Sequence, residues 1–232
     1  MKTRSVPVMR IATFAAAAAA AFSFAQQQAT AASETSAQYP DVSYERLASA
    51  QNDPGWLTYY RTYNGHAHSP LKQIDTSNVK GLKQVWSYKF PANLQQGFEA
   101  TPIVNGRFLF VTTPKDNVYA FDAATGKQLW KYEPNLGAES FKTACCDVIN
   151  RGVALYGKNV YVAMLNGEVA ALDAQTGALV WKKAMFDPGI GYAFSLAPLA
   201  LDGAIVVGSS GGEYGARGFI AALDPADGKV LW

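Results

Sequence analysis

The sequence contains few cysteines, few histidines and few charged residues. Its 232 residues include two cysteines, which are neighbours, and two histidines, and 16% of the residues are charged. Two adjacent cysteines exclude a fold held together by several long-range disulfides. No cluster of lysines and arginines suggests nucleic acid or an anionic lipid as a partner. No apolar run reaches the roughly 18 residues of a transmembrane helix, so we expect no membrane span.

The N-terminal residues have the pattern of an export signal. Three basic side chains lie within residues 1–10, and an alanine-rich apolar stretch follows over 11–24. Small residues at 23 and 25 suit cleavage after Ala25, although a site near 29–32 fits as well. We predict a signal peptide over 1–25, a mature N-terminal tail over 26–50 and a periplasmic protein. The leader has no cysteine, which disfavours a lipoprotein.

Cleavage of that leader changes the charge balance. The full sequence has 20 basic and 18 acidic residues, and three of the basic ones lie in 1–25. The mature chain therefore has 17 basic residues against 18 acidic ones, a net charge of about −1. The apparent excess of positive charge belongs to the leader.

The cysteine pair, Cys145-Cys146, has no other cysteine to bond with. A bond between the two is the first possibility in an oxidising compartment, and two free buried thiols are the alternative. Neighbouring Cα atoms lie about 3.8 Å apart, below the usual disulfide range of about 4.4–6.8 Å, so the bridge would close a tight, strained ring. Such a ring adds little stability, which favours a role in a site.

A repeat organises the rest of the chain. Segments 118–130, 169–181 and 220–232 each begin with alternating apolar residues, turn at an Asp-x-x-Thr-Gly or Asp-x-x-Asp-Gly sequence and end in tryptophan. The aspartates, glycines and tryptophans each advance by 51 residues. The turn is typical of a hairpin whose glycine has positive φ. Because Asp122, Asp173 and Asp224 recur at this period, we assign them to the turns and not to chemistry.

Two further strand-like runs precede each hairpin, so each unit has four strands. These runs cover 102–105 with 108–112, 153–155 with 160–164, and 199–201 with 205–208. Four-stranded units of this length are typical of a β-propeller, in which the final tryptophan wedges between blades and its N–H bonds a backbone carbonyl. We predict an all-β chain whose propeller part, 51–232, has about three blades after an opening segment that ends at Trp86. Closure needs more blades, so we expect a longer protein.

The repeated motif resembles the tryptophan-docking motif of pyrroloquinoline quinone (PQQ)-dependent alcohol dehydrogenases of the methanol/ethanol type, which are eight-bladed propellers. The resemblance implies that Cys145 and Cys146 form a disulfide that packs against one face of the PQQ ring. It also implies contacts with PQQ from Arg151, from Glu99, and from Ser195, where relatives often carry threonine.

The glycine-rich sequence 208–218 resembles the family's loop that binds a cofactor carboxylate and a metal ion. The resemblance implies PQQ contacts from Ser210, Gly211 and Gly212, and a metal-ligand role for Glu213. Exposed amides and an arginine are suitable donors to the carboxylates of PQQ, and a carboxylate suits a hard cation such as Ca²⁺. The ion is Ca²⁺ or a lanthanide.

The resemblance implies oxidation of primary alcohols to aldehydes, with electrons passed to a cytochrome c. The base, an aspartate in relatives, is expected beyond residue 232, and haem c only in a C-terminal part. The alternative from another class is a non-enzymatic scaffold propeller that binds protein partners, since such relatives share the repeat. A sugar or polymeric alcohol is an alternative substrate. His66 and His68 have metal-like spacing but no third ligand nearby, so we expect surface or structural roles.

Overall fold

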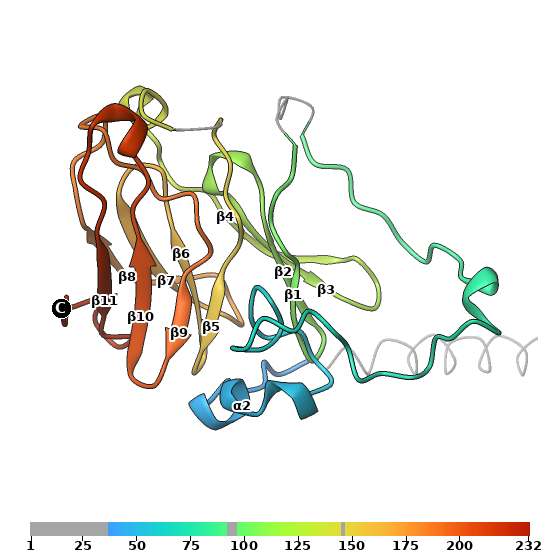
Figure 1. Cartoon of the computed structure of the whole chain (residues 1–232). Coiled ribbons are helices and arrows are strands. Elements are labelled where there is room, and N and C mark those ends of the chain that lie inside the picture. Colours follow the sequence, from blue (N-terminus) through green and yellow to red (C-terminus); the bar gives the residue numbers. More distant parts are fainter. Residues whose placement is uncertain (1–36, 92–96, 145–146) are drawn as a thin grey trace, which may run out of the picture. The chain divides into compact units, whose positions relative to one another are not determined.

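The computed structural model describes residues 37–91, 97–144 and 147–232. Within them, eleven strands form three antiparallel sheets that stand side by side (Figure 1). The first is β1-β2-β3-β4, the second β5-β6-β7-β8, and the third β9-β10-β11. Their bounds are Ile103–Asn105 (β1), Phe108–Thr112 (β2), Val118–Asp122 (β3), Gln128–Tyr132 (β4), Ala154–Tyr156 (β5), Asn159–Ala163 (β6), Glu168–Asp173 (β7), Leu179–Ala184 (β8), Leu199–Leu201 (β9), Ala204–Gly208 (β10) and Ile220–Leu223 (β11). The predicted all-β propeller is confirmed, and eleven of the twelve strands that the repeat predicts are present; the outer strand predicted at the end of the third unit is not formed as a strand.

The helical elements are short and connect or precede the strands. They are α2 (Tyr44–Ala48) and the 3₁₀ turns η1 (Ala50–Asn52), η2 (Val79–Gly81), η3 (Pro114–Asp116), η4 (Ala138–Phe141) and η5 (Gly212–Tyr214). None of the described helices has the length and apolarity to cross a membrane.

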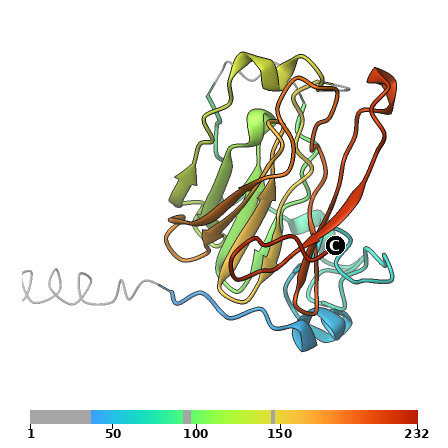
Figure 2. The same ribbon diagram turned by 90° about the vertical axis from the view of Figure 1, so that its left-hand side faces the viewer.

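Burial follows the order of strands within a blade. Every residue of β3 is buried, and so are the four central residues of β7. The outer strands β4 and β8 are mostly exposed or half-buried. The middle strands have neighbours on both faces, which explains their Val, Ala, Leu and aromatic composition. The third sheet lacks a full outer strand, and a single bridge between Leu223 and Val230 takes its place. Figure 2 shows the sheets from the side.

Three tryptophans, Trp86, Trp130 and Trp181, dock one unit onto the next, and we call them the docking tryptophans. Their indole N–H groups donate to the carbonyls of Ala123, Ala174 and Pro225, at 3.0, 3.0 and 2.9 Å. Each acceptor follows the turn aspartate of the neighbouring unit. The wedge predicted for the tryptophan at the end of a unit is confirmed for Trp130 and Trp181, whereas Trp232, the third such residue, is 65% exposed and makes no such contact with the described residues. Trp86 lies in no described strand but docks as the other two do.

The turn aspartates have the structural role predicted for them. Oδ1 of Asp122 accepts hydrogen bonds from the backbone and hydroxyl of Thr125, and Asp173 binds Thr176 in the same way. Oδ1 of Asp224 accepts the N–H of Ala226. His66 and His68, with exposed side chains, make no metal cluster with other described residues.

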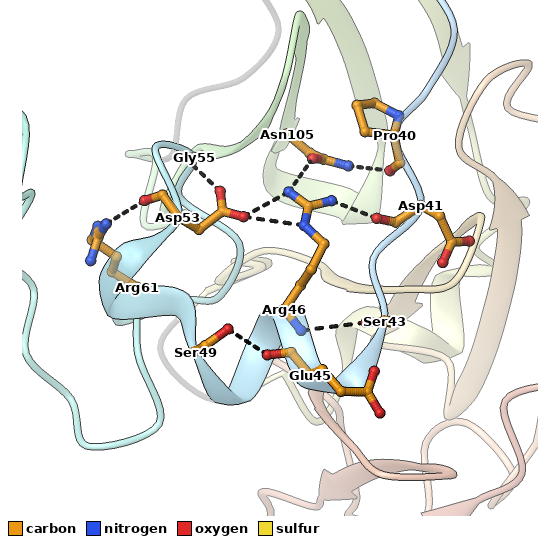
Figure 3. A network of polar contacts seen from close by, with 10 residues as sticks. All are labelled: Pro40, Asp41, Ser43, Glu45, Arg46, Ser49, Asp53, Gly55, Arg61 and Asn105. Carbon is orange, nitrogen blue, oxygen red and sulfur yellow. Dashed lines mark hydrogen bonds and ion pairs between the residues drawn. The ribbon is translucent and has the colours of Figure 1, made fainter.

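The residues before the first sheet are tied to it by Arg46 of α2 (Figure 3). Its guanidinium lies 2.8 Å from Oδ2 of Asp53 and 3.2 Å from Oδ1 of Asn105, at the end of β1. Asn105 in turn donates to the carbonyl of Pro40 at 2.6 Å. Val42 forms an isolated antiparallel bridge with Gly157, in the turn between β5 and β6, and Leu47 is buried. Residues 39–50, which fall within the tail expected over 26–50, thus pack on the sheets.

Candidate functional site

Three of the residues expected to bind a cofactor lie just before the first strand of a blade. Glu99 precedes β1, Arg151 precedes β5 and Ser195 precedes β9. Because the blades repeat the same topology, the residues that lead into their first strands lie at the same end of the blades. β5 and β9 also pack against each other. Residues far apart in sequence therefore meet at one end of the propeller.

Arg151 is the centre of this group. One terminal nitrogen lies 3.0 Å from Oε2 of Glu99. The other donates to the carbonyl and to Oγ of Ser195, each at 3.0 Å. Two of the other residues that the resemblance assigns to PQQ, Glu99 and Ser195, thus contact Arg151 directly, and we call Glu99, Arg151 and Ser195 the arginine cluster.

The cluster is open to solvent on one side. The side chains of Arg151 and Glu99 are 37% and 45% exposed. An ion pair so exposed contributes only about 0–1 kcal/mol to stability. Stability is therefore a weak reason for this arrangement. A partly exposed guanidinium with a fixed orientation does suit an anionic ligand such as a carboxylate.

A cavity of about 390 Å³ adjoins this arginine. Apolar residues form most of its wall, and Arg151 is the only charged residue among the described residues that line it. The wall comes from three places in the described chain, which are 57–65, the start of β5 with the residues before it, and 196–200. Tyr63 closes part of it by donating its hydroxyl to the carbonyl of Ala200 at 2.7 Å. Burial raises the pKa of Tyr63 to about 12, so this hydroxyl stays protonated as a donor at neutral pH.

Cys145 and Cys146 lie outside the described residues, but both flanks of the pair are anchored. On one side the hydroxyl of Thr143 donates to the carbonyl of Tyr192 at 3.3 Å. On the other side Val148 packs with Leu165 and Ala193 in a buried apolar cluster.

The glycine-rich turn after β10 adjoins the arginine cluster through Ala193. The carbonyl of Ala193 accepts both the N–H and the hydroxyl of Ser210, each at 2.9 Å. In this conformation the hydroxyl proton of Ser210 is already used, so Ser210 offers a ligand an acceptor oxygen. Gly211 has a φ of 127°, and a Cβ there would lie 1.9 Å from the carbonyl oxygen of Gly191. Only glycine fits at this position.

Glu213 is exposed in η5, just after Gly212. Within the described residues no three Asp, Glu, His or Cys side chains gather as metal ligands. A metal ion bound through Glu213 therefore needs further ligands from elsewhere. Its free carboxylate suits a hard cation, which prefers oxygen ligands.

Two buried residues next to the cluster were not singled out by the sequence. Asp116, in η3, is fully buried, and its Oδ1 accepts a hydrogen bond from the side chain of Asn150 at 2.8 Å. Its Oδ2 accepts the N–H of Leu165 at 2.7 Å. Desolvation raises the pKa of Asp116 to about 7, although both hydrogen bonds act in the opposite direction.

A signal for Asp116 does exist in the repeat. Gly167 occupies the equivalent position 51 residues later and has a φ of 82°, and Asp116 has a φ of 60°. An aspartate with positive φ, where the next blade has glycine, is uncommon and indicates a side chain needed for its contacts. From the sequence alone, the signal is only an aspartate where the next repeat has glycine; the burial and the contacts of Asp116 are seen only in the structure.

Comparisons with known proteins identify the family of the chain. Residues 56–232 match the PQQ family model described as the β-propeller domain of glucose/ethanol/alcohol dehydrogenases. The quinohemoprotein alcohol dehydrogenase ADH IIB of Pseudomonas putida is 42% identical over 185 residues, which cover 80% of this chain and 26% of that protein. A 1-butanol dehydrogenase (quinone) of Thauera butanivorans is 37% identical, with 88% and 34% covered.

Solved structures agree as well. The quinohemoprotein alcohol dehydrogenase ADHIIG of Pseudomonas putida superposes with a TM-score of 0.80 at 40% identity, over 84% of this chain and 29% of that one. A europium-containing methanol dehydrogenase gives 0.75 at 34% identity, over 81% and 33%. The chain thus spans between a quarter and about a third of these relatives. On its fold, its repeats and these matches, the chain belongs to the PQQ-type glucose/ethanol/alcohol dehydrogenase β-propeller family.

Proposed function

We propose that the chain is part of a periplasmic PQQ-dependent alcohol dehydrogenase that oxidises primary alcohols to aldehydes. The arginine cluster carries this proposal, because it presents an oriented, partly exposed guanidinium beside a mostly apolar cavity. The donor set fits PQQ, an anionic quinone with several carboxylates. When bound, PQQ supplies the acceptor for the hydride of the alcohol.

Within this proposal each candidate site residue has a defined role. When PQQ is bound, Arg151, Glu99 and Ser195 would all contact it, with Arg151 at an anionic oxygen, and the contacts of Glu99 and Ser195 with Arg151 would orient its guanidinium. Cys145 and Cys146, which lie outside the described residues, would form the disulfide that packs against the ring. Ser210, Gly211 and Gly212 approach a carboxylate at the edge of the ring, where the absence of side chains at the glycines allows close contact.

The metal ion and the electron acceptor are also part of the proposal. Glu213 contributes one ligand to Ca²⁺ or a lanthanide, and the remaining ligands and the base come from later blades. The similar methanol dehydrogenase that contains europium supports a lanthanide as one option. A relative named 1-butanol dehydrogenase (cytochrome c), 43% identical, supports transfer of electrons to a cytochrome c. A haem c domain of the protein's own would lie in the C-terminal part.

The test uses the full-length protein that carries this chain. The purified apoprotein is titrated with PQQ in the presence of Ca²⁺ or a lanthanide, and PQQ binding and dye reduction by primary alcohols are measured. Arg151→Ala should weaken PQQ binding by roughly tenfold or more, because a charge-assisted pair contributes about 1.5–3 kcal/mol. Arg107→Ala is the matched control, since Arg107 is an exposed arginine that pairs with Asp122 in a blade turn. A wild-type protein that binds no PQQ with either ion would refute the proposal.

A further inference from the structure

Asp116 is a buried carboxylate with an unusual set of partners. It is fully buried, and within the described part of the chain no basic side chain forms an ion pair with it. Its two oxygens accept hydrogen bonds only from neutral donors, which are the amide of Asn150 and the N–H of Leu165. Burying a carboxylate without a cationic partner costs free energy. A residue that is costly to bury and has defined contacts points to a role other than stability.

Asn150 connects Asp116 to the residues on either side of Arg151 through hydrogen bonds. It is 2% exposed, and its Nδ2 donates both to Asp116 and, at 3.0 Å, to the carbonyl of Ala163. Its Oδ1 accepts the N–H of Gly152 at 2.9 Å. The residue that precedes Arg151 and the residue that follows it are therefore locked to each other and to Asp116.

The turn that carries Asp116 holds this segment at a second point. The N–H of Lys115 donates to the carbonyl of Val148 at 2.8 Å. The carbonyl of Arg151 itself accepts the N–H of Thr101 from the segment before β1, at 3.4 Å. Residues 148–152 are thus fixed to the first blade by backbone bonds and by the buried pair of Asp116 and Asn150.

We propose that Asp116 is a positioning residue of the PQQ site, which holds Asn150 so that Arg151 faces Glu99, Ser195 and the cofactor. The assignment rests on the proposed function for the identity of the ligand. Asp116 touches neither the arginine cluster nor the cavity, so it acts through Asn150. The raised pKa of Asp116 shows that burial disfavours its charged form, and the hydrogen bonds to Asn150 and Leu165 keep the side chain in this buried position.

Asp116→Asn tests the positioning role directly, because both partners of Asp116, the side chain of Asn150 and the N–H of Leu165, are hydrogen-bond donors. The new amide has one acceptor oxygen, which Leu165 needs, so its NH₂ faces the NH₂ of Asn150. Asn150 could rotate its amide by about 180° so that its oxygen accepts from the new NH₂ at position 116. Its own NH₂ would then face the N–H of Gly152, which is also a donor, and its hydrogen bond to the carbonyl of Ala163 would be lost. Either way the hold on the residues beside Arg151 is broken, although the shape of the side chain at 116 is unchanged.

The exchanged pair, Asp116→Asn with Asn150→Asp, restores most of the network. The amide now at position 116 can donate to the carboxylate now at position 150 and accept from Leu165. That carboxylate can also accept the N–H of Gly152, and only the donor to Ala163 remains missing. Recovery in this double variant would separate positioning from simple loss of a buried residue.

Asp122→Asn is the matched control. Asp122 lies at the opposite end of β3 and binds the turn of the same blade through Thr125. Both single variants remove one buried carboxylate from the same blade, but only Asp116 contacts the segment before β5.

The experiment measures two quantities on the full-length protein. The first is the affinity for PQQ with the metal present, and the second is amide hydrogen exchange of residues 148–152 in the apoprotein. For Asp116→Asn we expect PQQ affinity to fall about tenfold and exchange of 148–152 to accelerate about tenfold, with most of both recovered in the exchanged pair. Asp122→Asn should change neither quantity more than twofold, although it destabilises the fold.

Each other result overturns the assignment or the proposed function. Unchanged exchange and affinity in Asp116→Asn, equal effects in Asp122→Asn, or no recovery in the exchanged pair would overturn the positioning role. If Asp116→Asn does not fold, Asn150→Ala takes its place, because it removes the same contacts and leaves Asp116 bonded to Leu165. If the wild type binds no PQQ, the proposed function fails, and the exchange data still decide whether Asp116 holds the segment of Arg151.

Discussion

Each docking tryptophan rests on a glycine of the next unit. Cβ atoms placed on Gly126, Gly177 and Gly228 would lie 2.5, 2.7 and 2.6 Å from the rings of Trp86, Trp130 and Trp181. All three glycines have positive φ, between 70° and 74°. A single residue thus meets two requirements, a left-handed turn and a flat surface for an indole ring.

Gly177→Ala should therefore destabilise the protein by about 2–4 kcal/mol, because backbone strain and displacement of the Trp130 ring add together. Gly203→Ala is the control. Gly203 has a φ of 64° but nothing within 4 Å of its Cβ position, so only the strain remains, about 1 kcal/mol. Chemical unfolding of the full-length variants measures both. Equal losses at the two positions would show that the ring contact is unimportant.

Asp116, in the turn before β3, and Asp122, at the end of β3, should make stability respond to pH with opposite signs. Burial raises the pKa of Asp116 to about 7, so between about pH 4 and 7 the native state holds a proton that the unfolded state releases. The free energy of unfolding from this group therefore falls as pH rises through that window. The Arg107 guanidinium holds the pKa of Asp122 below its usual range, so its contribution is lost only as pH falls in the acid range.

Unfolding measured between pH 5 and 8 tests this difference. Asp116→Asn should flatten the decrease of stability with rising pH, and Asp122→Asn should keep it. A wild-type slope that survives in Asp116→Asn would assign the proton to another group.

At the scale of the element, the three blade turns share one pattern, in which an aspartate at the start of the turn accepts hydrogen bonds from the residues that follow it. Thr176 donates its hydroxyl to Asp173 at 2.8 Å and accepts the N–H of Ala178 at 3.3 Å. In the third turn Asp227 replaces the threonine, and its Oδ1 accepts the N–H of Lys229 at 2.9 Å. An aspartate keeps the second bond but cannot make the first when ionised.

Restoring the repeat in the third turn should stabilise it. Asp227→Thr adds a hydroxyl donor for Asp224 and removes a like charge, so we expect a gain of about 0.5–1 kcal/mol. The reciprocal change, Thr176→Asp, should cost a similar amount in the second turn. Thermal unfolding of both variants decides the matter, and a loss of stability in Asp227→Thr would contradict it.

At the scale of the whole molecule, the described blades contact their neighbours through separate interfaces. Trp86 docks on the first sheet and Trp181 on the third, and the two tryptophans share no partner among the described residues. Effects at such separate sites usually add within about 0.5 kcal/mol.

Trp86→Phe and Trp181→Phe should each cost about 1 kcal/mol, the value of a lost hydrogen bond, and the double variant should cost their sum. Denaturant unfolding of the full-length protein gives the three values. A double variant that deviates by more than about 1 kcal/mol would indicate that the blades are coupled beyond their nearest neighbours.

The sequence predicted the fold well because its strongest signals are periodic. The repeat located the strands, the turn aspartates and the tryptophan wedges, each of which depends on local order. It did not indicate that residues 39–50 pack on the sheets, since a five-residue helix without repeats leaves a weak pattern.

The candidate site was only partly accessible from the sequence. Its residues were identified through a resemblance, and the structure places Arg151 in contact with Glu99 and Ser195. The pair of Asp116 and Asn150 went unnoticed, because burial of an acidic side chain depends on three segments far apart in the chain. The roles in binding PQQ and the metal remain predictions.

The pairing of each tryptophan with a glycine of the next unit also limits how such a chain can change in length. The first and second units each supply a ring to one interface and a glycine to the other, so a partial repeat between them would set a ring against a residue with a Cβ. We therefore expect loops at the blade ends to accept insertions more readily than the strands that carry the docking tryptophans and glycines. A change in the number of blades should therefore come from gain or loss of complete blades, whose length varies: Trp86 and Trp130 are 44 residues apart, and Trp130 and Trp181 are 51 apart.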